Sequence, residues 1–196
     1  IKIEYYLNVS DLFYRTTVTL TNNAITSIPE FYYHRTIDPE NNQDIGSGFA
    51  TTNTILYNPP NISTRAQVAA QQFSPWTSTI SFAANGNSFR AAHGVGGTND
   101  GSDIWNGTGG MDTTSGSSTT ADQSIALAYK ISNFASGNSE TFYFYTIFAD
   151  SLLATEFEII DLAYSNAGLV ITNDSLPDIV YTCGPFNAFL DGFNLD

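Results

Sequence analysis

The chain has 196 residues, of which 42% are hydrophobic and 14% aromatic, so it carries enough apolar side chains to bury a core, which excludes wholesale disorder. Nineteen acidic residues face six basic ones, and a net charge of −13 repels phosphate backbones and anionic membranes. We therefore expect no nucleic-acid partner and no direct membrane insertion. Cys183 is the only cysteine, so it cannot form an intramolecular disulfide.

Apolar and polar residues alternate in most of the chain, and turn residues separate the alternating segments. This period of two, with β-branched and aromatic residues, is typical of half-buried strands. We expect about eleven short strands, at residues 1–9, 12–21, 30–37, 49–57, 66–73, 78–84, 88–93, 124–131, 140–149, 168–172 and 178–182. Because the first residues already read as a strand, we also expect the chain to be cut from a longer protein.

Turn signals between these strands favour antiparallel pairing. "TNNAI" and "ANGNS" contain the Asn and Gly that hairpins need at positive φ, and "NPPN" blocks a hydrogen-bonded ladder. We expect one all-β domain over residues 1–196, an antiparallel two-sheet β-sandwich with long loops and at most one short helix. A closed barrel is the alternative. Residues 151–160 are the candidate helix or a wide connection, and 183–196 are a candidate linker or tail.

The segment 38–44 places oxygen-bearing side chains at every second position. These side chains belong to Asp38, Glu40, Asn42 and Asp44. They resemble the first half of an EF-hand loop, but Gln43 stands where that loop needs glycine and Phe49 where it needs a bidentate glutamate. We expect either a simpler calcium site completed by backbone carbonyls and water, or a solvated turn that begins at Asp-Pro.

A second group of side-chain oxygens lies in the glycine-rich loop 94–122. It consists of Asn99, Asp100, Ser102, Asp103, Asp112 and Asp122. Carboxylates this close in sequence repel one another unless a cation or solvent separates them. Two interpretations stay open. Calcium orders the loop and offsets an ordering cost of about 1 kcal/mol per residue, or the loop is polar and mobile.

Few residues are candidates for contact with a ligand. Arg35 either braces carboxylates or receives an anion, because basic residues are scarce in this chain. His93 ends a strand beside the acidic loop, and Trp105 lies within that loop, where a core role is less natural. Asp100 and Asp103 complete the set. No Gly-x-Ser-x-Gly elbow surrounds any serine, and we expect no enzyme.

Four motifs appear in a familiar order: "YYHRTIDPENN", "FATTNTIL", "FRAAHGVGGTNDGSDIWNGTG" and "IALAYKISNFASGNSETFYFYTIFADS". Over residues 10–155 the chain resembles the peptide-binding domain of giant calcium-dependent RTX adhesins of Gram-negative bacteria. The resemblance implies a calcium-laden module, monomeric within a larger protein at the bacterial cell surface, that serves adhesion and biofilm formation. It also implies recognition of peptide C-termini on host or neighbouring cells, with a calcium ion that helps to hold the terminal carboxylate.

By motif, the resemblance makes residues 38–44 a structural calcium site and residues 99–103, with Asp112, the site nearer the ligand. Two other function classes remain open. In a lectin-like module, calcium would bind vicinal sugar hydroxyls while Trp105 or a tyrosine stacks on the sugar ring. In a structural spacer, calcium would stiffen a long fibre without any recognition. The fold by itself does not choose among these classes.

Overall fold

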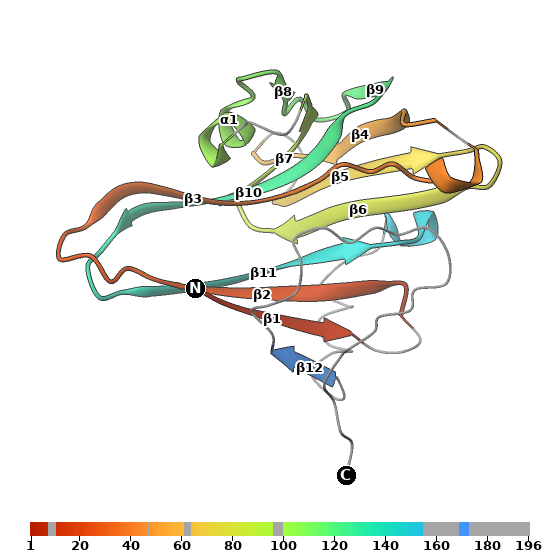
Figure 1. The fold of residues 1–196 in the computed structure, drawn as a ribbon. Coiled ribbons are helices and arrows are strands. Elements are labelled where there is room, and N and C mark those ends of the chain that lie inside the picture. The colour runs from red at the N-terminus through yellow and green to blue at the C-terminus, as the bar shows by residue number, and fades with distance from the viewer. Residues whose placement is uncertain (8–10, 47, 61–63, 96–99, 155–168, 173–196) are drawn as a thin grey trace, which may run out of the picture.

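The structure is a computed structural model that describes residues 1–7, 11–46, 48–60, 64–95, 100–154 and 169–172. It contains two antiparallel sheets, one of eight strands and one of four (Figure 1). The larger sheet holds, in spatial order, β12 (Leu169–Thr172), β1 (Lys2–Leu7), β2 (Phe13–Thr21), β11 (Ser139–Ile147), β6 (Ser78–Asn85), β5 (Arg65–Gln72), β4 (Thr51–Tyr57) and β9 (Ser118–Ala121). The smaller sheet holds β3 (Ile28–Ile37), β10 (Ser124–Phe134), β7 (Phe89–Gly94) and β8 (Met111–Asp112). The short helices are α1 (Gly101–Asn106), η1 (Gln43–Ile45) and η2 (Asp150–Leu152).

Strand β10 shows how the alternating sequence makes a sheet with two different faces. Ile125, Leu127 and Tyr129 point between the sheets and belong to the main core. Ala126 and Ala128 point to the opposite face, where they are also fully buried. Successive side chains of a strand point to opposite sides, so the second buried face requires its own cover. Helix α1 supplies that cover.

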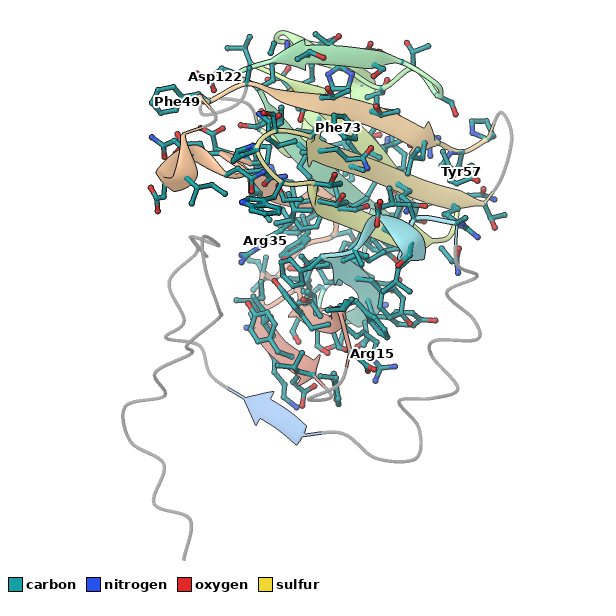
Figure 2. All side chains as sticks on the ribbon, turned by 90° about the vertical axis from the view of Figure 1, so that its right-hand side faces the viewer. Arg15, Arg35, Phe49, Tyr57, Phe73 and Asp122 are labelled. Carbon is teal, nitrogen blue, oxygen red and sulfur yellow. The ribbon has the colours of Figure 1, made fainter. Side chains whose placement is uncertain are left out.

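Side chains fill the space between the two sheets (Figure 2), and many of the core residues are aromatic. Phe142 of β11 stacks on Tyr129 of β10, with ring centroids 3.9 Å apart and planes 16° apart. Phe89 of β7 lies edge-on to Phe142, and Phe82 of β6 lies edge-on to Phe144 of β11. Each of these rings is almost completely shielded from solvent. The contacts of Phe142 with Tyr129 and Phe89 join rings of the two sheets into one sandwich.

Two connections cross between the sheets at the same end of the molecule. The link from β2 to β3 lies beside the link from β10 to β11, at the left in Figure 1. Asn22 ties the two links together, because its backbone N–H donates to the Asn138 carbonyl at 2.9 Å and its carbonyl accepts from Gly137 N–H at 2.8 Å. Gly137 has a φ of 77°, which glycine adopts without strain. The chain therefore enters the smaller sheet at β3 and leaves it after β10 at the same end, where β3 and β10 pair side by side.

The expected antiparallel two-sheet sandwich with one short α-helix is confirmed, and neither sheet closes on itself within the described ranges. The α-helix lies outside the segment 151–160, for which a helix or a wide connection was expected, and residues 155–160 lie outside the described residues. The α-helix occupies residues 101–106, whereas the described part of the predicted 151–160 segment holds only the 3-10 turn η2. The strand expected at 178–182 and the segment 183–196 lie outside the described residues. No helix among the described residues is long and apolar enough to span a membrane.

Candidate binding surface beside helix α1

The described part of the glycine-rich loop is ordered by its own secondary structure. Helix α1 begins at Asp100, whose Oδ1 accepts hydrogen bonds from the backbone N–H groups of Ser102 at 2.8 Å and Asp103 at 3.0 Å. It ends at Gly107, which has a φ of 67° and donates its N–H to the Asp103 carbonyl. An Asp N-cap and a left-handed glycine after the last turn are ordinary helix signals. Both signals are present in the sequence, although the polar composition of the loop led us to expect no helix there.

Helix α1 packs on the outer face of the four-stranded sheet. Ile104 is 1% exposed and lies among Ala92, Ala126, Ala128 and Met111. Small alanine side chains leave room for the larger isoleucine, so the helix approaches the sheet closely. At Gly101 the approach is closer still, since a Cβ there would lie 2.6 Å from Cβ of Tyr32. Residue 101 must therefore be glycine for α1 to sit where it does.

The docked helix brings Trp105 to a group of side chains from three strands. The guanidinium carbon of Arg90 on β7 lies 4.4 Å from the Trp105 ring centroid, and Lys130 Nζ on β10 lies 5.9 Å from it. Tyr32 on β3 has its ring 6.3 Å from Trp105 at an interplanar angle of 56°. We call Tyr32, Arg90, Trp105 and Lys130 the Trp105 surface. It combines two cations with two aromatic rings in a strongly acidic chain.

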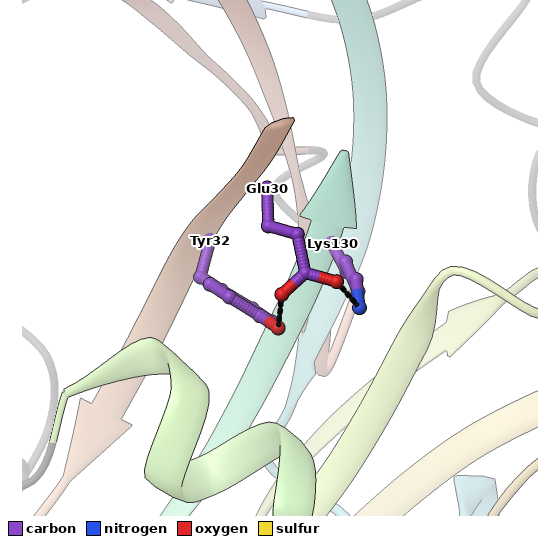
Figure 3. Close-up of polar contacts among 3 residues, drawn as sticks. All are labelled: Glu30, Tyr32 and Lys130. Carbon is purple, nitrogen blue, oxygen red and sulfur yellow. Dashed lines mark hydrogen bonds and ion pairs between the residues drawn. The ribbon is translucent and has the colours of Figure 1, made fainter. Parts of the chain in front are cut away.

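An ion pair fixes one side of this surface (Figure 3). Glu30 accepts a hydrogen bond from the Tyr32 hydroxyl at 2.9 Å, and its other carboxylate oxygen pairs with Lys130. These bonds lower the pKa of Glu30 and raise that of Lys130, because each favours the charged form. Both residues are therefore charged at neutral pH, and Lys130 already has an anionic partner.

Arg90 is held differently. Its Nη1 donates to the backbone carbonyls of Asn87 at 3.1 Å and Phe89 at 2.7 Å. Among the residues that the structure describes, no carboxylate pairs with it. Partial burial lowers the pKa of Arg90, which stays well above neutrality. The guanidinium thus keeps its charge and has no anionic partner in the described part of the chain.

The residues predicted for the first calcium site do not face one point. Asn42, at a φ of 65°, turns its side-chain amide to the Trp76 carbonyl, and Asp44 is exposed on η1. Glu40 is half-buried. Asp38 follows Ile37 of β3, which pairs with Ile125 of β10, so Asp38 and Asp122 lie at the same end of this strand pair. Burial, and to a smaller extent the charge of Asp122, raises the pKa of Asp38. Across the described ranges, no three His, Cys, Asp or Glu side chains are grouped around a possible metal position.

In the second predicted calcium group, carboxylates make local hydrogen bonds. Asp100 caps α1 and also accepts from the Ser102 hydroxyl at 2.7 Å. Asp103 Oδ1 accepts from the Thr108 hydroxyl at 2.7 Å. Asp112 accepts from the Thr114 N–H at 2.7 Å and from the Ser117 hydroxyl. These bonds tie each carboxylate to a backbone N–H or a hydroxyl of the same loop. Asn99 lies outside the described residues, and calcium binding by this group stays a prediction.

The five predicted ligand contacts do not form one site. His93 is 2% exposed, and its ring nitrogens lie 3.1 Å from Gln123 Oε1 and 3.3 Å from Ser117 Oγ, so its role is structural. Arg35 follows His34 on β3, and because the His34 ring lies on the α1 side of the strand, Arg35 points away from α1. Burial raises the pKa of Tyr14, while a hydrogen bond to Thr146 and then the charge of Arg35 act in the opposite direction.

Only Asp100, Asp103 and Trp105 of the predicted contacts share α1 and its N-cap. Sequence reasoning identified Trp105 but missed Tyr32, Arg90 and Lys130. These three lie far apart along the chain and meet only through the pairing of β10 with both β3 and β7.

No protein-family model matches this chain, and no curated protein sequence matches it. The chemistry of the surface is therefore the basis for assigning a function.

Proposed function

We propose that the protein is a non-enzymatic, calcium-dependent adhesion module of a bacterial surface protein, and that it binds peptides through their C-terminal carboxylate at the Trp105 surface. The observation that carries the proposal is the guanidinium of Arg90, which lies against Trp105 without a carboxylate partner among the described residues. The chain contains nineteen acidic residues that could have neutralised it.

A terminal carboxylate fits the unpaired part of Arg90. Backbone carbonyls occupy Nη1, which fixes the guanidinium plane and leaves the edge formed by Nε and Nη2 for a ligand. A carboxylate binds such an edge through two parallel hydrogen bonds. Because the side chain is partly buried beneath Trp105, this charge pair is less screened than one in open solvent. Lys130, 5.9 Å from the same ring, adds to the positive potential.

The aromatic rings of the surface offer contact area for the last side chains of the peptide. Trp105 and Tyr32 are half-buried and held by their neighbours, so little conformational entropy is lost when a ligand packs on them. The Glu30 carboxylate stands beside Lys130 and repels a second ligand anion. Specificity for a single terminal carboxylate follows from this pattern of one unpaired and one paired cation.

The proposed calcium site lies at Asp38 and Asp122. Two neighbouring carboxylates suit a calcium ion, which binds oxygen ligands and would remove the repulsion that raises the pKa of Asp38. Backbone carbonyls and water would complete its coordination. Asp38 directly follows β3 and Asp122 closely precedes β10, so an ion there would brace the two strands that carry Tyr32 and Lys130. Calcium thus stabilises the site, while Arg90 receives the carboxylate.

The test is a library of random peptides displayed with free C-termini, selected against the protein in millimolar calcium. Peptides that bind are then synthesised as free acids and as amides. We expect the amide to lose binding, and Arg90→Gln to weaken the affinity at least tenfold. Lys2→Gln, which removes an exposed charge on β1, is the matched control and should bind as wild type. Each variant is melted to confirm that it folds.

Equal binding of acid and amide, or wild-type affinity in Arg90→Gln, would contradict the proposal. Binding on a glycan array in the absence of peptide binding would favour the lectin-like alternative. Failure of both selections would favour the structural spacer.

A further inference from the structure

The opposite end of the sandwich exposes large apolar side chains from two loops. Trp76, in the turn between β5 and β6, is 71% exposed, and Ile45, Phe49 and Phe73 are each more than half exposed. We call these four residues the aromatic end. It lies at the right in Figure 1, at the opposite end of the sandwich from the crossing links. Neighbouring apolar side chains with a polar rim are a common feature of interaction sites.

Hydrogen bonds hold the two loops of the aromatic end together. The Asn42 side chain donates to the Trp76 carbonyl, and the buried Asn41 side chain donates to the Ala70 carbonyl at 3.1 Å. The Gln72 side chain donates to the Ala50 carbonyl at 2.9 Å and accepts from Phe73 N–H at 2.9 Å. The loops are therefore organised before any partner binds. A pre-organised surface loses less entropy on binding than a mobile one.

The charged side chains of the loops at the aromatic end are all acidic. Asp38, Asp44 and Asp122 are exposed at this end, and Figure 2 looks onto it with Phe49, Phe73 and Asp122 labelled. Residues 38–50, 73–77 and 118–123 contain no Lys or Arg. Exposed carboxylates without a basic residue in the same loops give this end a negative potential.

This charge pattern selects among the possible occupants. A second copy of the chain would bring the same carboxylates face to face, and an anionic lipid surface would be repelled in the same way. A cationic polypeptide would be attracted, and its aliphatic or aromatic side chains would cover the exposed rings. Tryptophan also attracts ammonium and guanidinium groups through its ring face.

We propose that the aromatic end is a second binding surface that takes a basic peptide segment of a partner protein. Apolar side chains of that segment pack on Phe49, Phe73 and Trp76, and its lysine or arginine side chains pair with Asp38 and Asp122. The surface shares no residue with the Trp105 surface. Asp38 and Asp122 are also the carboxylates of the proposed calcium site, so calcium competes with the basic segment for them. Recognition of a carboxylate at Arg90 is tested separately by Arg90→Gln, so the two proposals fail on different variants.

The experiment uses the full chain and a random library of displayed twelve-residue peptides, selected in chelator so that calcium does not neutralise the carboxylates. The same library is selected against Phe49→Ser/Trp76→Ser. We expect wild type to enrich peptides that combine basic with aromatic or aliphatic residues, and the double variant to bind them at least tenfold more weakly. Ile25→Ser, at a 96% exposed position in the link from β2 to β3, should bind them as wild type.

A charge variant completes the design. Asp122→Asn should weaken the selected peptides severalfold, whereas Glu4→Gln on β1, which removes the same charge elsewhere, should not. Three outcomes would overturn the inference: no enrichment above background, enriched peptides that lack basic residues, or enriched peptides that bind the double variant as well as wild type. Binding of neutral glycans or lipid vesicles through Trp76 without peptide enrichment would also overturn it.

Discussion

Replacing Ile104 with alanine tests whether one side chain holds α1 on the sheet. The substitution removes three carbon atoms from a position that is 1% exposed, among Ala92, Ala126, Ala128 and Met111. At about 0.8 kcal/mol for each buried carbon, the loss is about 2–3 kcal/mol before any cavity term. A helix of six residues is unstable alone, so α1 should detach when this contact is lost.

The assay combines urea unfolding, followed by far-UV circular dichroism, with tryptophan fluorescence. Trp105 becomes the only emitter in a Trp76→Phe background, because the chain has two tryptophans. In Ile104→Ala we expect the free energy of unfolding to fall by about 2–3 kcal/mol. If α1 opens locally instead, Trp105, which is half-buried in wild type, should become more accessible to acrylamide. Ile25→Ala, at a 96% exposed site, should change stability by less than about 0.5 kcal/mol. If Ile104→Ala matched that control in both readouts, the docking of α1 by Ile104 would be refuted.

Three further predictions concern residues that the sequence singled out. His93→Ala should lower the free energy of unfolding by about 1–3 kcal/mol, because it leaves Gln123 and Ser117 without their ring partners. It should leave peptide affinity unchanged, and a loss of affinity in a folded variant would contradict the structural role of His93. In chelator, Asp38→Asn should stabilise the protein slightly, by less than about 0.5 kcal/mol. A carboxyl whose pKa is raised on folding destabilises the native state above that pKa, and this destabilisation fades as the pH falls through it. Urea titrations at pH 7 and at pH 4 check the sign. Calcium at a hundredfold excess over its Kd should add about 2.7 kcal/mol to wild type and nothing to Asp122→Asn, while equal melting curves in calcium and in chelator would count against the ion site.

Local sequence was sufficient for most of the strands and their buried faces, although it missed β8 and β9 in the glycine-rich loop. The alternation through Ile125, Leu127 and Tyr129 predicts a strand with one face in the core, because apolar side chains at every second position can be buried together only in an extended chain. The turn residues and the absence of long helical periods then favour an antiparallel sandwich. Each of these features depends on neighbours within a few residues, which is the range over which sequence patterns are informative.

Helix α1 could not be predicted from the local sequence pattern. Its six residues contain two large apolar side chains, Ile104 and Trp105, too few to show a helical period. The helix is stable because Ile104 packs against alanines of β7 and β10, and because Gly101 has no Cβ that would clash with Tyr32. Tertiary packing, and not helix propensity, stabilises it.

The Trp105 surface was decided by tertiary structure in the same way. The sequence by itself determined that basic residues are scarce, that Trp105 lies in a polar loop and that the strands alternate. It could not show that Lys130 would lie opposite Tyr32, or that Arg90 would lie opposite Ala128 on the other side of β10, because register between strands is set by the match of whole faces. Long-range strand pairing brings distant residues together, and it is this pairing that converts scattered cations and rings into one surface.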